Sequence, residues 1–149
     1  MTTMTGTVRL DGEARWQAKS GTGHELTIDG PADHGGQNAG FRAMELMLLS
    51  LGGCLGGAML HVLRRMRQDV TGYEIKLEGV RDDQPPTVYR NVTLHHTITG
   101  RNVDEAAVKK ALDFVEDKYC PASITVASTA KLLHEIHIVG DTAGVLTDA

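Results

Sequence analysis

The chain has 149 residues, a length that fits one domain. Hydrophobic residues make up 41% of it and charged residues 23%, which is the composition of a globular protein and excludes a disordered tail, a fibrous repeat and a disulfide miniprotein. The formal net charge is −4, so we expect neither a nucleic acid nor an anionic membrane surface as a partner.

The N-terminus and the cysteine content indicate the compartment. The first seven residues, MTTMTGT, are polar and lack the apolar core of a secretory signal, so we expect a cytoplasmic protein. Structural disulfides are rare there, and the two cysteines, Cys54 and Cys120, then indicate redox chemistry, metal binding or plain burial. They do not form a C-x-x-C pattern, which makes a zinc site a weak hypothesis. Two buried, inert thiols are an equal alternative.

The first part of the chain predicts a small sheet. Residues 6–29 contain three short strands, separated by turn signals at Asp11-Gly12 and at residues 20–23. Residues 30–40 are rich in Gly, Pro, Asp and Asn, so we expect a loop.

Residues 41–67 predict a long helix that is apolar on nearly every side, as in a helix buried all round or spanning a membrane. We disfavour a membrane span, because the apolar stretch is short, Glu45 and His61 bracket it, and no aromatic belt flanks it. The glycine pairs at 52–53 and 56–57 each cost about 1 kcal/mol per glycine relative to alanine. We therefore expect a close backbone approach or a bend there, and a homodimer in which two such helices share a core.

The rest of the chain predicts a second sheet with a helix. Residues 73–78 and 90–99 alternate as half-buried strands, and His96 shares the apolar face of the latter, as a core or pocket residue. Asn102 is expected to cap a helix that begins at Val103, with Glu105 completing a capping box. A last strand is expected over 130–139. This order predicts an α+β fold with antiparallel sheets, in one domain over residues 1–149 whose last part spans 70–139.

Local chemistry distinguishes the two cysteines. Cys54 lies within the long helix beside a glycine pair, where a cysteine is ordinarily a small core residue. Cys120 precedes Pro121, and proline favours the first position of a helix. A thiolate at that helix start would be stabilised by free backbone N–H groups, so we expect a lowered pKa for Cys120. His134 and His137 lie three apart and therefore point to opposite faces of a strand, which does not make a metal pair.

Two segments resemble a known family. Residues 35–54, GGQNAGFRAMELMLLSLGGC, are similar to the first-cysteine segment of OsmC-like proteins, G-x-x-P-M-E-L-L-L-x-x-L-G-G-C. Residues 118–121, KYCP, resemble the second-cysteine segment. The resemblance covers nearly the whole chain and is greatest to the YhfA-like branch.

This resemblance implies an intertwined homodimer, with antiparallel sheets wrapped around a long buried central helix and active sites at the dimer interface. It implies that Cys54 is the peroxidatic cysteine, which becomes a sulfenic acid, and that Cys120 resolves it as a disulfide. A dithiol, notably a lipoylated protein, would then reduce the disulfide. No cofactor and no metal are implied.

The sequence departs from the family pattern beside the first cysteine. The family's peroxidases pair that cysteine with a Glu ten residues earlier and with an Arg from the N-terminal strands. Met44 stands ten before Cys54, and Glu45 stands nine before, about half a turn out of phase on an ideal helix. Glu45 is therefore expected to face away, and its alternative role is a first-turn charge that complements the helix dipole. Arg15 lies in the right part of the N-terminal strands to be the Arg.

The expected function is thiol-dependent reduction of organic hydroperoxides in defence against oxidative stress, in an apolar pocket at the dimer interface. The alternative is a non-catalytic or weakly active OsmC-like stress protein or small-molecule binder. Hydrolysis or acyl transfer through Cys54 is a third possibility, which the sequence disfavours because it shows no convincing Cys–His dyad.

Overall fold

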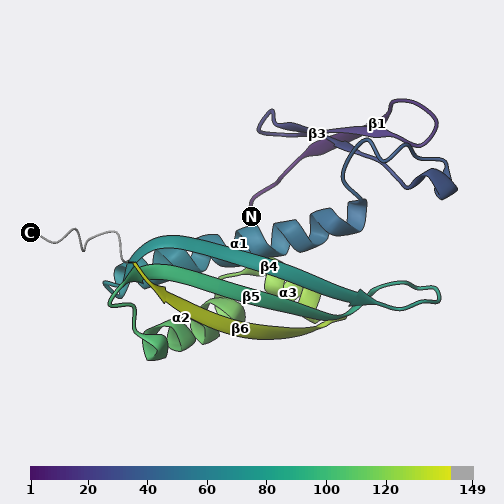
Figure 1. Ribbon diagram of the computed structural model, residues 1–149. Helices are drawn as coiled ribbons and strands as arrows, with labels where there is room; N and C mark the ends of the chain where they lie inside the picture. The colour runs from purple at the N-terminus through teal and green to yellow at the C-terminus, as the bar shows by residue number, and fades with distance from the viewer. Residues whose placement is uncertain (142–149) are drawn as a thin grey trace, which may run out of the picture. The chain divides into compact units, whose positions relative to one another are not determined.

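The computed structural model describes residues 1–141 and divides them into two compact units. The first unit is Met1–Met47, and the second begins at Leu48. Figure 1 gives the order of their helices and strands along the chain.

The first unit is an antiparallel sheet followed by a loop. Its strands are β1 (Gly6–Leu10), β2 (Trp16–Ser20) and β3 (Glu25–Ile28), paired in that order, which confirms the three predicted strands. The loop over residues 30–40 contains one 3-10 turn, Ala32–His34. Val8 and Leu10 are among the exposed large apolar side chains of the chain. The sheet therefore carries apolar surface that this chain leaves in contact with solvent.

Helix α1 (Ala43–Arg65) begins two residues later and ends two residues earlier than the predicted range. Its buried residues, Leu51, Leu55, Met59 and Leu63, recur every four positions and form one stripe. The helix is not buried on every side within the chain, because Met47 and Leu49 are 44% and 51% exposed. By length and composition alone α1 could cross a membrane, but the core helix of a soluble protein passes the same test.

The glycines of α1 serve two different sides of the helix. A Cβ on Gly52 would lie 2.8 Å from Leu77 Cδ1, and one on Gly56 would lie 3.1 Å from Ile75 Cδ1. These two glycines therefore make room for side chains of a strand, rather than for a close backbone as the sequence suggested. A Cβ on Gly53 or Gly57 would meet no atom of residues 1–141 within 4 Å.

The second unit contains a mixed sheet. Its strands are β4 (Asp69–Arg81), β5 (Tyr89–Arg101) and β6 (Lys131–Gly140), in the order β4-β5-β6. β4 and β5 pair antiparallel, but β6 runs parallel to β5, so the prediction of wholly antiparallel sheets is wrong for this pair. The physical reason is the connection: β5 and β6 are joined by two helices, the kind of crossover that returns a strand in the same direction. The predicted α+β class is confirmed.

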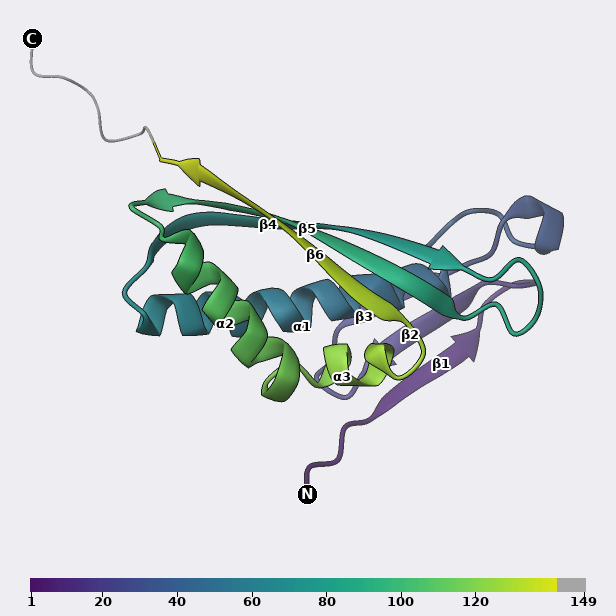
Figure 2. The ribbon, with the colours of Figure 1, turned by 90° about the horizontal axis from the view of Figure 1, so that it is seen from below.

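Three helices lie on one face of this sheet: α1, α2 (Glu105–Lys118) and α3 (Pro121–Ala127) (Figure 2). Along β5, the alternate residues Val92, Leu94, His96 and Ile98 are buried. Glu74 and Lys76 of β4 are exposed. The sheet thus has one packed face and one polar face, as antiparallel strands often do.

The start of α2 differs from the prediction by two residues. Asp104 is the N-cap, and its carboxylate accepts a hydrogen bond from the Ala106 N–H at 3.2 Å. Asn102, the predicted cap, has φ 54°, a left-handed conformation that asparagine tolerates better than most residues. The chain therefore turns at Asn102, and the helix begins at Glu105 rather than at Val103.

Candidate functional site

Helix α1 carries Cys54 beside its buried stripe rather than within it. Leu51 and Leu55, the neighbouring members of that stripe, are fully buried, whereas Cys54 is partly exposed and is a free thiol. The helix thus holds the thiol at the boundary between the packed core and the accessible surface, where a small molecule can reach it.

Cys120 is the N-cap of α3 and is 0% exposed. Its Sγ accepts a hydrogen bond from the Ser123 N–H at 3.3 Å, and Pro121 occupies the first turn, where its missing N–H costs nothing. The position predicted for Cys120 at the helix start is therefore confirmed.

The predicted effect of that position on the thiol is wrong. Burial raises the pKa of Cys120 above its ordinary value, although contacts from Ser123 act in the opposite direction. A backbone N–H that reaches a sulfur at 3.3 Å does not compensate for removing the thiolate from water. Cys120 is thus a protonated thiol at neutral pH.

The two cysteines are neighbours in the structure. The Cys54 side chain contributes to the raised pKa of Cys120, through a hydrogen bond and through repulsion between the two charges. Cys54 belongs to α1 and Cys120 to the start of α3, so the packing of the second unit brings together two thiols that lie 66 positions apart.

Ser123 places a second polar atom at this site. The residue is buried, and its hydroxyl makes no hydrogen bond of ordinary geometry with the residues that the structure describes, although it lies close enough to the Cys120 sulfur to favour the thiolate. A buried hydroxyl without a good hydrogen bond is uncommon, because the hydrogen bonds that it made to water in the unfolded chain are not replaced. Ser123 therefore adds a buried hydroxyl beside the Cys120 sulfur.

Glu45 is engaged at the start of α1. Its carboxylate accepts a hydrogen bond from the Arg42 N–H at 3.0 Å and lies in the first turn of the helix. This contact satisfies one of the unpaired N–H groups at a helix start. It fits the alternative role, in which Glu45 complements the helix dipole.

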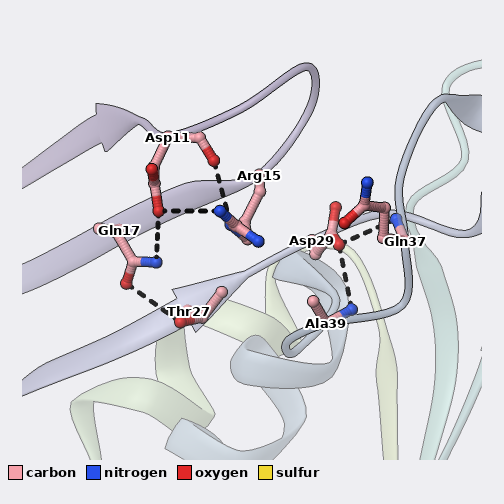
Figure 3. Close-up of polar contacts among 7 residues, drawn as sticks. All are labelled: Asp11, Arg15, Gln17, Thr27, Asp29, Gln37 and Ala39. Carbon is pink, nitrogen blue, oxygen red and sulfur yellow. Dashed lines mark hydrogen bonds and ion pairs between the residues drawn. The ribbon is translucent and has the colours of Figure 1, made fainter.

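Arg15 is engaged within the first unit, as Figure 3 shows. Its Nε donates to the Asp11 carbonyl oxygen at 3.0 Å, and its guanidinium lies 3.3 Å from the Asp11 carboxylate. A hydrogen bond from Gln17 and the charge of Arg15 hold the pKa of Asp11 below its usual range. Arg15 thus links the two ends of the turn between β1 and β2.

Asp29 organises the loop that precedes α1, a role that the sequence pattern did not reveal. Its carboxylate accepts hydrogen bonds from the N–H groups of Gln37 and Ala39, at 2.9 and 3.0 Å (Figure 3). These bonds lower the pKa of Asp29 below its ordinary value. The signal available in the sequence was only an Asp before a Gly-rich loop.

Histidine is prominent in the second unit, but no metal centre emerges. Over residues 1–141, no group of three or more His, Cys, Asp or Glu side chains could hold a metal ion. His96 is buried, as predicted, and bonds to Tyr73 and His134. The sequence did not predict that His134, from another strand, would meet it.

Comparison with known proteins identifies the class of this chain. A family model described as OsmC-like protein matches residues 35–135, which include both cysteines. The chain therefore belongs to the OsmC-like family, and the resemblance of its cysteine segments is confirmed.

Particular relatives agree with this assignment. Protein YhfA of Escherichia coli strain K12 is 32% identical over 124 residues, which cover 81% of this chain and 87% of that protein. A hypothetical protein from Aquifex aeolicus VF5 has a solved structure that matches 95% of this chain and 99% of its own, at 27% identity and a TM-score of 0.83. The structure of an organic hydroperoxide resistance protein OsmC from Legionella pneumophila matches 92% of this chain and 98% of its own, with a TM-score of 0.72. At 16% identity, that last likeness shows a common fold.

Proposed function

We propose that this protein is a thiol-dependent peroxidase that reduces organic hydroperoxides in defence against oxidative stress. The observation that carries the proposal is the contact between two free thiols, Cys54 and Cys120, in an OsmC-like fold. A solved relative of the same fold is an organic hydroperoxide resistance protein, which supports the choice of substrate class. Nothing in this chemistry requires a cofactor.

The environments of the two thiols support different roles. Cys54 is partly exposed, so a peroxide can approach its sulfur, and we assign it the peroxidatic role. Cys120 is fully buried and its pKa is raised by burial, so it is unsuited to attack a peroxide from solvent. As a protonated thiol, it is suited to react with a sulfenic acid formed on Cys54.

The proposed cycle has three steps. The Cys54 thiolate attacks the distal oxygen of ROOH, the O–O bond breaks, and the alkoxide leaves and takes up a proton as ROH. Cys120 then attacks the sulfenic acid sulfur, which forms the Cys54–Cys120 disulfide and releases water. A dithiol, such as the lipoyl group of a lipoylated protein, returns both cysteines to thiols and becomes a disulfide itself.

Ser123 fits the intermediate of this cycle. Its buried hydroxyl, beside the Cys120 sulfur, can donate to the oxygen of a sulfenic acid formed on Cys54, an atom that the resting thiols lack. Glu45 and Arg15 remain auxiliary candidates for activating Cys54. Each already has a partner, Arg42 and Asp11 respectively, that would have to be exchanged.

We propose a cytoplasmic homodimer with an apolar substrate pocket at its interface, and neither a nucleic acid nor a membrane as a partner. Apolar side chains exposed on α1, such as Leu49, and on the first sheet, such as Val8, support this. An apolar pocket would favour alkyl hydroperoxides over hydrogen peroxide, because their carbon chains gain from burial.

A second candidate is a weakly active stress protein or a small-molecule binder. The specific observation behind it is Met44 at the position of the family's activating Glu, together with the engagement of Glu45 by Arg42. In that case the thiol pair would be kept while the activation of Cys54 is reduced.

The test begins with the reduced protein, mixed separately with tert-butyl hydroperoxide and hydrogen peroxide while free thiols are counted over time. The proposal predicts rapid loss of two thiols per chain, faster with the organic peroxide. Cys54→Ser should abolish the loss of thiols. Cys120→Ser should lose one thiol per chain, because Cys54 is oxidised only as far as a sulfenic acid, which dimedone traps. Slow loss with both oxidants would favour the binder, and turnover by Cys54→Ser would refute the assignment of roles.

A further inference from the structure

Four side chains from four elements form a continuous chain of contacts in the second unit. The Tyr73 hydroxyl (β4) lies 2.7 Å from His96 Nδ1 (β5), and His96 Nε2 lies 2.9 Å from His134 Nδ1 (β6). His134 Nε2 lies 3.4 Å from a carboxylate oxygen of Glu116 (α2), an ion-pair distance rather than a hydrogen-bond geometry. The peroxidase cycle uses none of these groups.

The inner members of this chain are neutral and the outer end is charged. His96 is 1% exposed, and burial lowers its pKa to about 4. Burial also raises the pKa of Tyr73, so both rings are uncharged near neutral pH. Glu116 is the outermost group, with a side chain 31% exposed, and supplies the negative charge.

That charge fixes the direction of every hydrogen bond. An ionised carboxylate at 3.4 Å attracts an N–H and repels a nitrogen lone pair, so the nitrogen of His134 that faces Glu116 carries the proton. In the neutral form of His134, Nδ1 has a lone pair, which must accept from His96 Nε2–H. His96 in turn has a lone pair on Nδ1, which accepts from the Tyr73 hydroxyl. All donors therefore point from Tyr73 towards Glu116.

We propose that Tyr73, His96, His134 and Glu116 form a proton relay that takes up a proton at Tyr73 and holds it as charge on His134. A proton from hydronium binds the Tyr73 oxygen while the original hydroxyl proton passes to His96 Nδ1. The proton on His96 Nε2 passes to His134 Nδ1. One proton enters, each neutral ring keeps its proton count, and His134 becomes an imidazolium beside the Glu116 carboxylate.

The surroundings of the two ends support this direction. Tyr73 helps to line a hollow of about 360 Å³ that Gly53 and Gly57 of α1 also line, so the proton enters from the side of α1 on which the proposed dimer and its substrate pocket form. The neighbouring His95 also contributes to the lowered pKa of His96, and it contacts Glu135 at 2.9 Å and Glu78 at 3.9 Å. The buried stripe of α1 is apolar, so the carboxylate that can hold the charge within this chain of contacts is Glu116.

The relay makes a specific prediction for histidine NMR. In the reduced, 15N-labelled protein at pH 7.5, both His96 and His134 should be neutral with the proton on Nε2. On acidification His134 should become charged, and at the same midpoint His96 should move its proton to Nδ1 while it stays neutral. A His96 ring that keeps the proton on Nε2 while His134 is charged would overturn the proposal, as would a different tautomer at pH 7.5.

Two variants and a control separate a relay from mere packing. Glu116→Gln removes the stabilising charge, so the common midpoint should fall by about one pH unit. Tyr73→Phe removes the oxygen that accepts from His96 Nδ1–H once His134 is charged, so the common midpoint should fall in this variant as well. Glu135→Gln is the control, because Glu135 contacts His95 and not the relay. It should leave the midpoint and the tautomers of His96 and His134 unchanged. An unmoved midpoint in Glu116→Gln, with the fold verified by the same spectra, would refute the relay.

Discussion

At the scale of single residues, Cys120 is subject to opposing influences. Its place at the start of α3 provides an N–H from Ser123, which favours a thiolate, while its burial favours the neutral thiol. Burial prevails, because desolvation of an anion is costly and a sulfur accepts only weak hydrogen bonds. The sequence could predict the cap from Cys-Pro, but not the depth of burial, which depends on packing among α1, α2 and the sheet.

This balance predicts the order in which the two thiols are alkylated. With iodoacetamide at pH 7.5, Cys54 should be labelled first, because it is accessible and Cys120 is not. Labelling of Cys120 should stay slow up to pH 9.0, which is the ordinary pKa of its thiol. It should rise only above that pH, since the thiolate is the reactive form. Peptide mass spectrometry measures both rates, and the protein in urea, where both thiols should react alike, is the control. Equal labelling of the folded protein at pH 7.5 would contradict the order.

The same pKa direction has a consequence for stability. The folded protein holds a proton on Cys120 that the unfolded chain loses near pH 9, so the folded state binds more protons above that value. The contribution to stability is therefore complete below about pH 9 and is lost as the pH rises further.

At the scale of elements, the start of α2 provides a direct test of the cap. Asp104→Ala should lower the free energy of unfolding by about 1 kcal/mol, because the N–H of Ala106 loses its acceptor. Asn102→Gly should cost nothing or stabilise slightly, because glycine adopts a positive φ without strain. Urea unfolding of the two variants gives both values. A larger loss of unfolding free energy in Asn102→Gly than in Asp104→Ala would instead support Asn102 as the cap, as the sequence predicted.

The elements also mark the limit of sequence analysis. Alternation and turn signals were sufficient for the three strands of the first sheet and for β4 and β5, whose pairing is local. They also located β6, predicted over 130–139 and observed at Lys131–Gly140, but they could not give its direction, which depends on two intervening helices and a parallel pairing with β5. The contact between His96 and His134 depends on that same pairing, so it was equally hidden. The sequence motif found both cysteines, but their proximity follows from the packing of α3.

For the molecule as a whole, α1 is a helix whose apolar surface a single chain does not fully cover. It buries a stripe at every fourth residue, while Leu49 and Met47 stay exposed on other sides. Gly53 and Gly57 each cost about 1 kcal/mol relative to alanine, although no atom of the described part of the chain lies within 4 Å of a Cβ placed there. A glycine that the chain itself does not require is explained when a second backbone approaches that side. The proposed homodimer supplies one, and the single domain over residues 1–149 remains a prediction of the sequence.

The dimer can be tested at these open glycines without disturbing the fold of one chain. Gly57→Leu should shift the protein from dimer to monomer in analytical ultracentrifugation at micromolar concentration, because the new side chain occupies space that the partner helix needs. Ala127→Leu, at an exposed position of α3, is the matched control and should remain a dimer. If Gly57→Leu associates as the unsubstituted protein does, the second helix does not pack on this side of α1. If the unsubstituted protein is a compact monomer, the hypothesis of a core shared between two α1 helices is refuted, and the exposed side of α1 would then need another explanation.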